Sequence, residues 1–154
     1  MPFFKEGVDY CLSDKTISLM ESSAKHASSK LKAYHESIQD TLDIDDFNIF
    51  DKISKASAIS ASWITVLYNE KDCLKFLQRE RDLVKDTYIN SLDENCKAYL
   101  KDKMAEENCP RLKDLDKAIK IQEDIVLFLK ESNEVIKQFS WTIKNVIELK
   151  KLER

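Results

Sequence analysis

The amino-acid sequence predicts an all-α protein, and three observations support this prediction. The 154 residues include one glycine, Gly7, and two prolines, Pro2 and Pro110, so residues suited to tight turns are almost absent. No Asn-Gly or Asp-Gly pair is present to form a β-hairpin. Charged residues make up 34% of the chain, which is typical of long helices. We therefore expect three long amphipathic helices in a helical bundle or coiled-coil-like arrangement.

Residues 1–49 are expected to form an N-terminal helical extension. Residues 1–12 are a short apolar lead-in, which either packs on the core or a neighbouring subunit or is only partly ordered. Ser13 or Asp14 can cap a first helix, and the acidic residues from Asp43 to Asp46 interrupt its pattern. Within this helix, apolar or small residues recur at alternating steps of three and four, as in a heptad repeat: Ile17, Met20, Ala24, Ala27, Leu31, Tyr34 and Ile38.

Residues 50–154 are expected to form a helical core that ends in an oligomerisation helix. A second helix is predicted from about Phe47 to Tyr88, and its middle is rich in small residues that permit close approach of another helix. The segment 89–109 is polar and irregular, with a short helix around Lys97 to Glu106. Pro110 ends this segment because proline cannot continue the hydrogen-bond ladder of a helix.

The third helix, predicted from about Leu112 to Leu152, has two adjacent apolar stripes. A single surface helix needs one stripe, so two stripes predict packing against more than one neighbour. We expect a homo-oligomer, although a three-helix bundle within one chain is an alternative that also buries both stripes. Polar Gln122 and Asn133 occupy seam positions, where they can set register and partner number. The candidate oligomerisation residues are Ile119, Gln122, Val126, Leu129, Asn133, Ile136, Ile143 and Ile147.

The charge and cysteine content favour a protein of the reducing cytoplasm without a membrane segment. The formal net charge is −3, with −4 on residues 1–50, −1 on residues 51–109 and +2 on residues 110–154. The four cysteines lack Cys-x-x-Cys spacing, and we expect free, reduced thiols. The longest uncharged stretch, from Ala56 to Asn69, is too short and too rich in serine to span a bilayer.

Motifs for catalysis and for metal or cofactor binding are absent from the sequence. The two histidines, His26 and His35, are nine residues apart and lie on opposite sides of the first predicted helix. No nucleophile elbow, phosphate-binding loop or Glu-x-x-His motif is present. We therefore expect no cofactor, no metal and no catalytic residues, and a protein that binds and assembles rather than an enzyme.

Two sets of basic residues can bind nucleic acid. On the second helix, Lys71, Lys75 and Arg79 recur every four residues, beside Arg81 and Lys85. On the third helix, lysines at positions 130, 137, 144 and 151 form one narrow line, because a seven-residue interval drifts only slightly around a helix. Nearby aromatic residues can stack on unpaired bases: Tyr88, Phe139 and Trp141. The alternative is that both sets are solvated helix faces, since acidic residues alternate with the first set.

The run from Ile136 to Lys151 resembles the closing signature of the UvsY family, the recombination mediators of T-even-type phages. That signature contains a serine and an aromatic residue, then Ile-Lys-Asn, Ile-Glu and a basic pair. The matching residues are Ser140, Trp141, Ile143, Lys144, Asn145, Ile147, Glu148, Lys150 and Lys151. Leu115-Asp116-Lys117 and the basic stretch from Leu74 to Tyr88 are also similar, so that the resemblance covers about residues 52–152.

The resemblance implies a protein of phage DNA recombination and repair that binds single-stranded DNA. It also implies a ring-like homo-oligomer, a hexamer or heptamer, that helps to load a RecA-like recombinase onto strands covered by a single-stranded-DNA-binding protein. On the helix before Tyr88, the positions that match the family's DNA-binding residues are Arg79, Arg81 and Lys85. With the spacing argument, the candidate DNA-binding set is Lys75, Arg79, Arg81, Lys85, Tyr88, Lys137, Lys144 and Lys151. The acidic extension can modulate this binding, for example by occupying the basic face. The alternative function is a homo-oligomeric helical scaffold or protein-interaction module without a nucleic-acid role.

Overall fold

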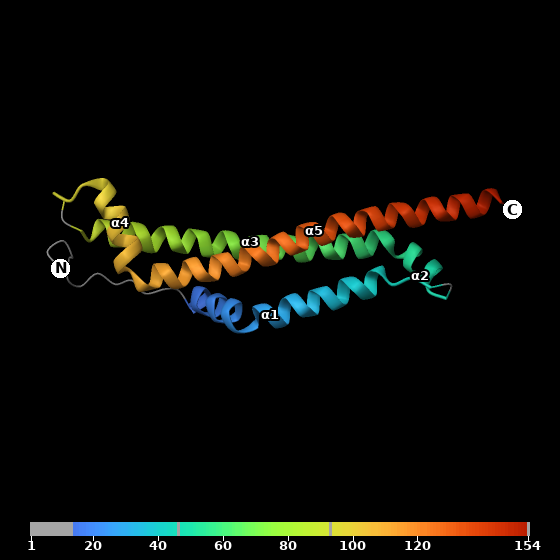
Figure 1. The fold of residues 1–154 in the computed structure, drawn as a ribbon, viewed down its shortest axis with the longest axis horizontal. Helices are drawn as coiled ribbons and strands as arrows, with labels where there is room; N and C mark the ends of the chain where they lie inside the picture. Colours follow the sequence, from blue (N-terminus) through green and yellow to red (C-terminus); the bar gives the residue numbers. More distant parts are fainter. Residues whose placement is uncertain (1–13, 46, 93, 154) are drawn as a thin grey trace. The chain divides into compact units, whose positions relative to one another are not determined.

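The computed structural model describes residues 14–45, 47–92 and 94–153 (Figure 1). These residues are mostly helical, which confirms the all-α class for the described part of the chain. The apolar lead-in at residues 1–12 and the candidate cap Ser13 lie outside the described residues. No helix among the described residues is long and apolar enough to cross a membrane. In chain order, the helices are α1 (Asp14–Leu42), α2 (Ile49–Ser54), α3 (Ala56–Asn90), α4 (Ala98–Asn108) and α5 (Pro110–Leu152).

The limits of the first, fourth and fifth helices agree with the sequence pattern to within a few residues. Helix α5 begins at Pro110, two residues before the predicted start. Proline suits the first position of a helix because its φ angle is already helical and its missing N–H would have no intrahelical partner there. Helix α4 lies where the short helix was expected.

The prediction of one continuous second helix is wrong, because the chain breaks at Lys55 between α2 and α3. Lys55 has φ −99° and ψ 0°, outside the regular helical values. One residue earlier, the hydroxyl of Ser54 donates a hydrogen bond of 2.8 Å to the carbonyl of Asp51. The Asp51 carbonyl also accepts the backbone N–H of Lys55 at 3.1 Å, so it is shared between a side chain and the backbone at the end of α2.

The turn between α1 and α2 is closed by polar side chains. The carboxylate of Asp45 accepts hydrogen bonds from the backbone N–H groups of Phe47 and Asn48, and the side chain of Asn48 accepts one from the N–H of Asp45. The ammonium of Lys52 binds the backbone carbonyls of Asp40 and Asp43. A cation is favourable there because the last carbonyls of a helix have no intrahelical donor.

The chain forms two compact units, each built from segments far apart in the sequence. Unit 1 combines the described residues up to Ala27 with Asp72–Glu123. Unit 2 combines Ser28–Lys71 with the residues from Asp124 onward. Both units draw residues from either side of the expected boundary at residue 49, because α1, α3 and α5 each continue from one unit into the other.

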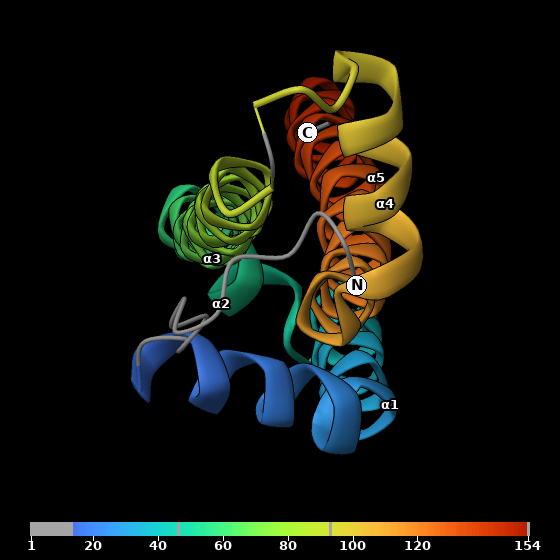
Figure 2. The same cartoon turned by 90° about the vertical axis from the view of Figure 1, so that its left-hand side faces the viewer.

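The core of unit 1 is formed by α3, α4 and α5. Leu77, Leu112 and Leu115 are fully buried in it. Figure 2 shows α4 beside the first turns of α5, and Ala105 of α4 belongs to the same buried cluster. Cys96 and Cys109 are buried free thiols, as expected, and Cys73 is half-buried, whereas Cys11 lies outside the described residues.

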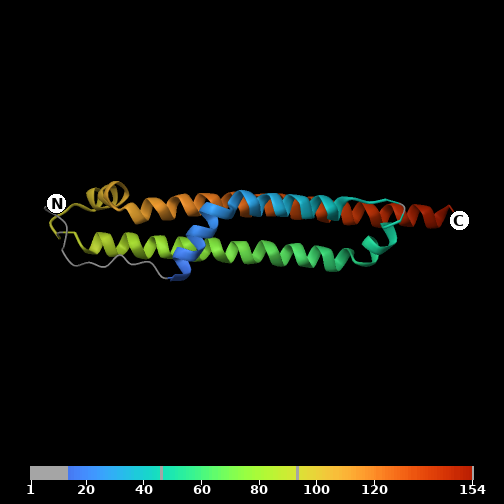
Figure 3. The same cartoon turned by 90° about the horizontal axis from the view of Figure 1, so that it is seen from below.

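Segments of α1, α3 and α5 lie side by side in unit 2 (Figure 3). Contacts from α1 and α5 meet at Trp63 of α3. The Trp63 side chain on α3 is only 9% exposed. Its indole N–H donates to the hydroxyl of Thr41 on α1 at 3.4 Å, and its backbone carbonyl accepts from the amide of Asn133 on α5 at 3.3 Å. The ring of Tyr34 packs edge-on against the indole, with centroids 6.2 Å apart. Trp63 therefore joins α1 and α5 to α3.

Candidate nucleic-acid interface

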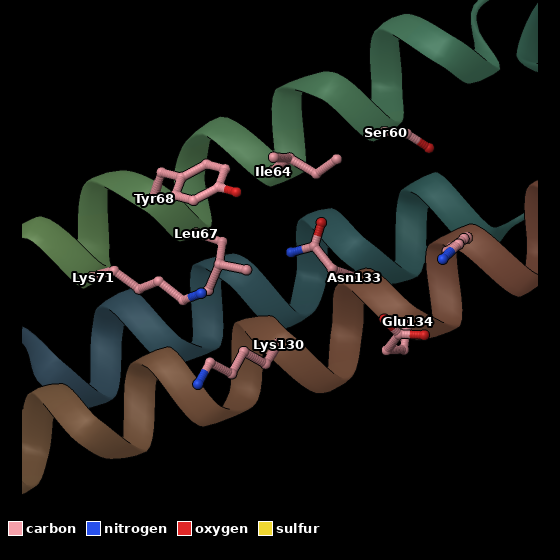
Figure 4. A pocket seen from close by; sticks show the side chains of 9 residues that line it. Ser60, Ile64, Leu67, Tyr68, Lys71, Lys130, Asn133 and Glu134 are labelled. Atoms are coloured by element: carbon pink, nitrogen blue, oxygen red, sulfur yellow. The ribbon is translucent and has the colours of Figure 1, made fainter.

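A groove of about 600 Å³ lies between α3 and α5 in unit 2 (Figure 4). The α3 wall consists of Ser60, Ile64, Leu67, Tyr68 and Lys71, and the α5 wall of Lys130, Asn133, Glu134 and Lys137. A second depression shares Ser60, Ile64 and Lys137 and continues to Trp141 and Lys144. We call the two depressions together the lysine groove.

Helical periodicity places each wall of the lysine groove on one face of its helix. On α5, the lysines at 130, 137 and 144 are seven residues apart, which is almost two full turns. On α3, the lining residues step by three, four or one, so they share one side of the helix. Small residues, Ser57 and Ala61, line the end of the groove near Trp141.

The side chains that line the lysine groove carry more positive than negative charge. Four ammonium groups, those of Lys71, Lys130, Lys137 and Lys144, face a single carboxylate, that of Glu134. Among the described residues, none of these four lysines forms an ion pair. The Lys71 ammonium lies 5.5 Å from the centroid of the Tyr68 ring. Cations without a carboxylate partner remain available to an anionic ligand.

Two exposed aromatic side chains accompany the lysines. Tyr68 on α3 is 59% exposed and Trp141 on α5 is 69% exposed. Trp141 also borders a further shallow depression formed by Glu134, Lys137, Gln138 and Thr142. Large aromatic side chains are usually buried because their exposure to water is unfavourable. An exposed aromatic ring beside several lysines offers a surface on which an unpaired base can stack.

The predicted DNA-binding residues lie in different parts of the structure, and two of them line the lysine groove. Lys137 and Lys144 line the groove, while Lys151 is exposed in the last turn of α5 and does not line it. Lys75 and Arg79 are exposed on α3 in unit 1.

The other candidates, Arg81, Lys85 and Tyr88, have partners inside unit 1. Arg81 is half-buried and pairs with Asp116 and, at 3.9 Å, with Asp82. Lys85 is half-buried and pairs with Asp102 at 3.6 Å. Tyr88 is 2% exposed in the core of unit 1, so its ring is covered and does not offer a face to a base.

Lys71 and Lys130 belong to the basic sets of the sequence but were left out of the candidate DNA-binding set, and Tyr68 and Ile64 were not considered. The signal for Lys130 was present in the seven-residue line of α5, and Tyr68 lies three residues from Lys71 on the same face of α3. The missing information was which face of α3 meets the lysine line, and that depends on tertiary packing. Asn133, expected at an oligomer seam, instead lines the groove and donates to the carbonyls of Trp63 and Leu129.

The other predicted oligomerisation residues are mostly buried within one chain. Ile119 belongs to the core cluster of unit 1, and Gln122 is also buried there. In unit 2, the buried residues are Val126, Leu129, Ile136 and Ile143, and Ile147 is half-buried. These residues thus pack as the single-chain bundle alternative describes. Apolar residues of α5 that remain exposed lie on other faces: Leu127, Val135, Trp141, Val146, Leu149 and Leu152.

The fold and the groove define a helical protein with a lysine-lined, aromatic surface in its second unit. No group of three or more histidine, cysteine, aspartate or glutamate side chains suited to hold a metal occurs among the described residues. Comparisons with protein-family models, with curated proteins and with solved structures find no match.

Proposed function

We propose that this chain binds single-stranded DNA along the lysine groove and acts as a recombination mediator. The observation that supports the proposal is the set of four lysines without ion-pair partners, together with Tyr68 and Trp141. Proteins that bind unpaired strands without sequence preference combine a basic groove for the phosphates with aromatic side chains for the bases. The lysine groove has both components.

The length and charge of the groove suit a short stretch of unpaired strand. A seven-residue step along a helix rises about 10 Å, so Lys130, Lys137 and Lys144 span about 21 Å. Each phosphate contact to a single strand contributes about −0.7 to the slope of log K against log salt. Four such contacts would give a slope of about −3. Stacking of a base on Trp141 or Tyr68 would add about 1–3 kcal/mol.

In the proposed role, the protein acts in the cytoplasm with two protein partners. It would hold strands that a single-stranded-DNA-binding protein covers and help a RecA-like recombinase to load on them. The resemblance of residues 136–151 to the UvsY family supports this part of the proposal. Assembly into a hexameric or heptameric ring would repeat the groove around the ring, and repeated weak contacts gain avidity without a strong single site.

The experiment that tests DNA binding uses a fluorescent oligothymidine and a matched pair of double variants. Lys137→Ala with Lys144→Ala removes two groove lysines seven residues apart. Lys113→Ala with Lys120→Ala removes two exposed lysines with the same spacing on the same helix, in unit 1. We expect the groove variant to bind at least about tenfold more weakly near 50 mM salt, with a salt slope reduced by about 1.4, and the control to bind normally. Equal binding by the two variants, or no binding by the native chain, would refute the proposal.

A second candidate function, a self-assembling helical scaffold, is favoured by the apolar end of α5. The C-terminal turns of α5 extend beyond α2 (Figures 1 and 3), and they expose Val146, Leu149 and Leu152. Exposed apolar residues at one end of a helix are typical of an interface with another chain. Light scattering tests this function: Leu149→Ser with Leu152→Ser should lower the mass in solution, while a native mass equal to one chain would exclude assembly.

A further inference from the structure

Helix α1 passes behind the lysine groove rather than through it. Figure 4 shows the α1 ribbon running behind the side chains that line the groove. Of the α1 residues in unit 2, Ile38 is buried, whereas Leu31, Tyr34 and Thr41 are only half-buried. This part of the acidic extension therefore leaves the lysines uncovered and supports the groove from the opposite side.

One α1 residue, Tyr34, contacts α3 at two residues, Trp63 and Glu70, which do not line the groove themselves. Its hydroxyl donates a 2.7 Å hydrogen bond to Oε1 of Glu70, and the ammonium of Lys30 pairs with the same oxygen. The Tyr34 ring packs edge-on against the ring of Trp63 at an interplanar angle of 75°. On α3, Trp63 lies seven residues before Glu70. Glu70 is the residue before Lys71, and the carbonyl of Trp63 accepts from Asn133 on the opposite wall.

These contacts define the side of α3 that faces α1. Trp63 and Glu70 are seven residues apart and so lie on one side of the helix, toward α1. Lys71 follows Glu70 by one residue, about 100° around the helix, and Ser60, Ile64 and Tyr68 share its side. The Glu70 side chain is buried, and a buried carboxylate is unfavourable without hydrogen-bond and ionic partners. While Glu70 is bound to Tyr34 and Lys30 of α1, the side of α3 that carries Tyr68 and Lys71 therefore faces α5.

We propose that α1 is a positioning strap for the lysine groove and that Tyr34 is its positioning residue. When α1 is in place, the α3 wall faces the lysine line of α5. When α1 detaches, α3 loses the contacts that set its rotation, and the groove loses Tyr68 and Lys71 as ligand contacts. The DNA part of this inference rests on the proposed function, whereas the coupling between α1 and α3 is independent of any ligand.

The small buried area of α1 makes it a reversible element. Ile38 is the one buried side chain among its described residues in unit 2, so apolar burial is modest, and contacts of Tyr34, Lys30 and His35 add to its attachment. Segments with few buried contacts open more readily than the core. A partner that captures α1 would thus lower the affinity of the groove without touching it.

The two tryptophans provide separate reporters for this inference. Trp63 is buried next to α1, and Trp141 is exposed at the groove. In a Trp141→Phe background, Tyr34→Ala should shift the Trp63 emission to longer wavelength, because water reaches the indole. Hydrogen exchange should become at least about tenfold faster in residues 28–42, with a smaller increase in residues 56–71. Tyr34→Phe keeps the ring and should give an intermediate result.

DNA binding by the Tyr34 variant is measured with Trp141 in place, beside two controls. Tyr34→Ala should weaken oligothymidine binding at least about fivefold and reduce the salt slope by about 0.7, the value of one lost phosphate contact. Tyr99→Ala, at an exposed tyrosine of α4, should change neither quantity. Val84→Ala removes a buried side chain from the core of unit 1 and should lower the stability of the protein. As long as this variant remains folded, its salt slope should be unchanged. It therefore separates the positioning effect of Tyr34 from a general loss of stability.

The outcomes distinguish the strap from the DNA site. If the native chain binds no oligonucleotide, the proposed function fails, and the exchange data alone decide the inference. In that case, faster hydrogen exchange in residues 28–42 with unchanged hydrogen exchange in residues 56–71 would overturn the proposed coupling between α1 and α3. If the native chain binds DNA, an unchanged affinity and salt slope for Tyr34→Ala would overturn it, whatever happens to α1.

Discussion

The guanidinium of Arg81 on α3 is bound to the carboxylate of Asp116 on α5, 35 residues away in the sequence. Lys85, one turn further along α3, pairs with Asp102 of α4. These contacts hold the helices of unit 1 together and neutralise basic residues that the sequence pattern assigns to DNA. The lysines of the groove in unit 2 have no such partners among the described residues.

The first prediction follows from this difference. Arg81→Ala with Lys85→Ala should change oligothymidine affinity less than twofold, because both cations are already paired. The free energy of unfolding should fall by about 1 kcal/mol or less per pair, the usual value for partly exposed ion pairs. Urea denaturation and fluorescence anisotropy measure the two effects. A loss of affinity as large as that of Lys137→Ala with Lys144→Ala would place the DNA on unit 1 instead.

The second prediction concerns Trp141. Saturating oligothymidine should quench the Trp141 emission, and Trp141→Ala should weaken binding by about five- to hundredfold, which corresponds to the loss of about 1–3 kcal/mol of stacking. Acrylamide quenching supplies the control, since Trp63 is covered and should resist the quencher with or without DNA. Emission from Trp141 that stays constant through the titration would rule out stacking on this residue.

The third prediction separates the shape of the groove from its charge. Ser60 lines both depressions of the groove, whereas Ser62 is exposed on α3 and does not line them. Ser60→Phe should fill the groove and reduce DNA affinity about tenfold without altering any charge, and Ser62→Phe should leave affinity unchanged. Circular dichroism checks that both variants remain helical. Similar affinities for the two variants would mean that the lysines act as an open surface and that no groove is needed.

The fourth prediction compares two leucines of α5. Leu129 is fully buried within the chain, and Leu149 is exposed. Leu129→Ala should reduce the free energy of unfolding by about 2–5 kcal/mol because it leaves a cavity. Leu149→Ala should have an effect within about 0.5 kcal/mol on a single chain. A large loss of stability for Leu149→Ala that depends on protein concentration would instead show that this residue is buried between copies.

Local patterns in the sequence were sufficient for the helices but not for all of their limits. The scarcity of glycine and the alternating steps of three and four predicted α1 and α5 nearly to the residue. The break at Lys55 was missed because apolar or small residues continue at helical spacing across it, at Ile53, Ala56 and Ile59. A continuous periodic pattern does not reveal a local change in backbone angles.

The candidate site was predicted in part, on α5 alone. Lys137 and Lys144 were selected because a seven-residue interval aligns side chains on any helix. Tyr88 and Lys85 belong to an equally regular basic and aromatic stretch, yet one is covered by the core of unit 1 and the other is paired with a carboxylate. Regular spacing indicates which residues share a face, and it does not indicate what that face meets.

The sequence by itself determined the helical class, the two stripes of α5 and the lysine line, because these depend on neighbours within a few turns of one helix. Only the tertiary structure decided that α3 and α5 form the lysine groove, that the apolar seam of α5 is buried within one chain and that α1 lies behind the groove. The physical reason is that each of these features depends on contacts between residues many turns apart, such as Tyr34 with Glu70 and Trp63 with Asn133.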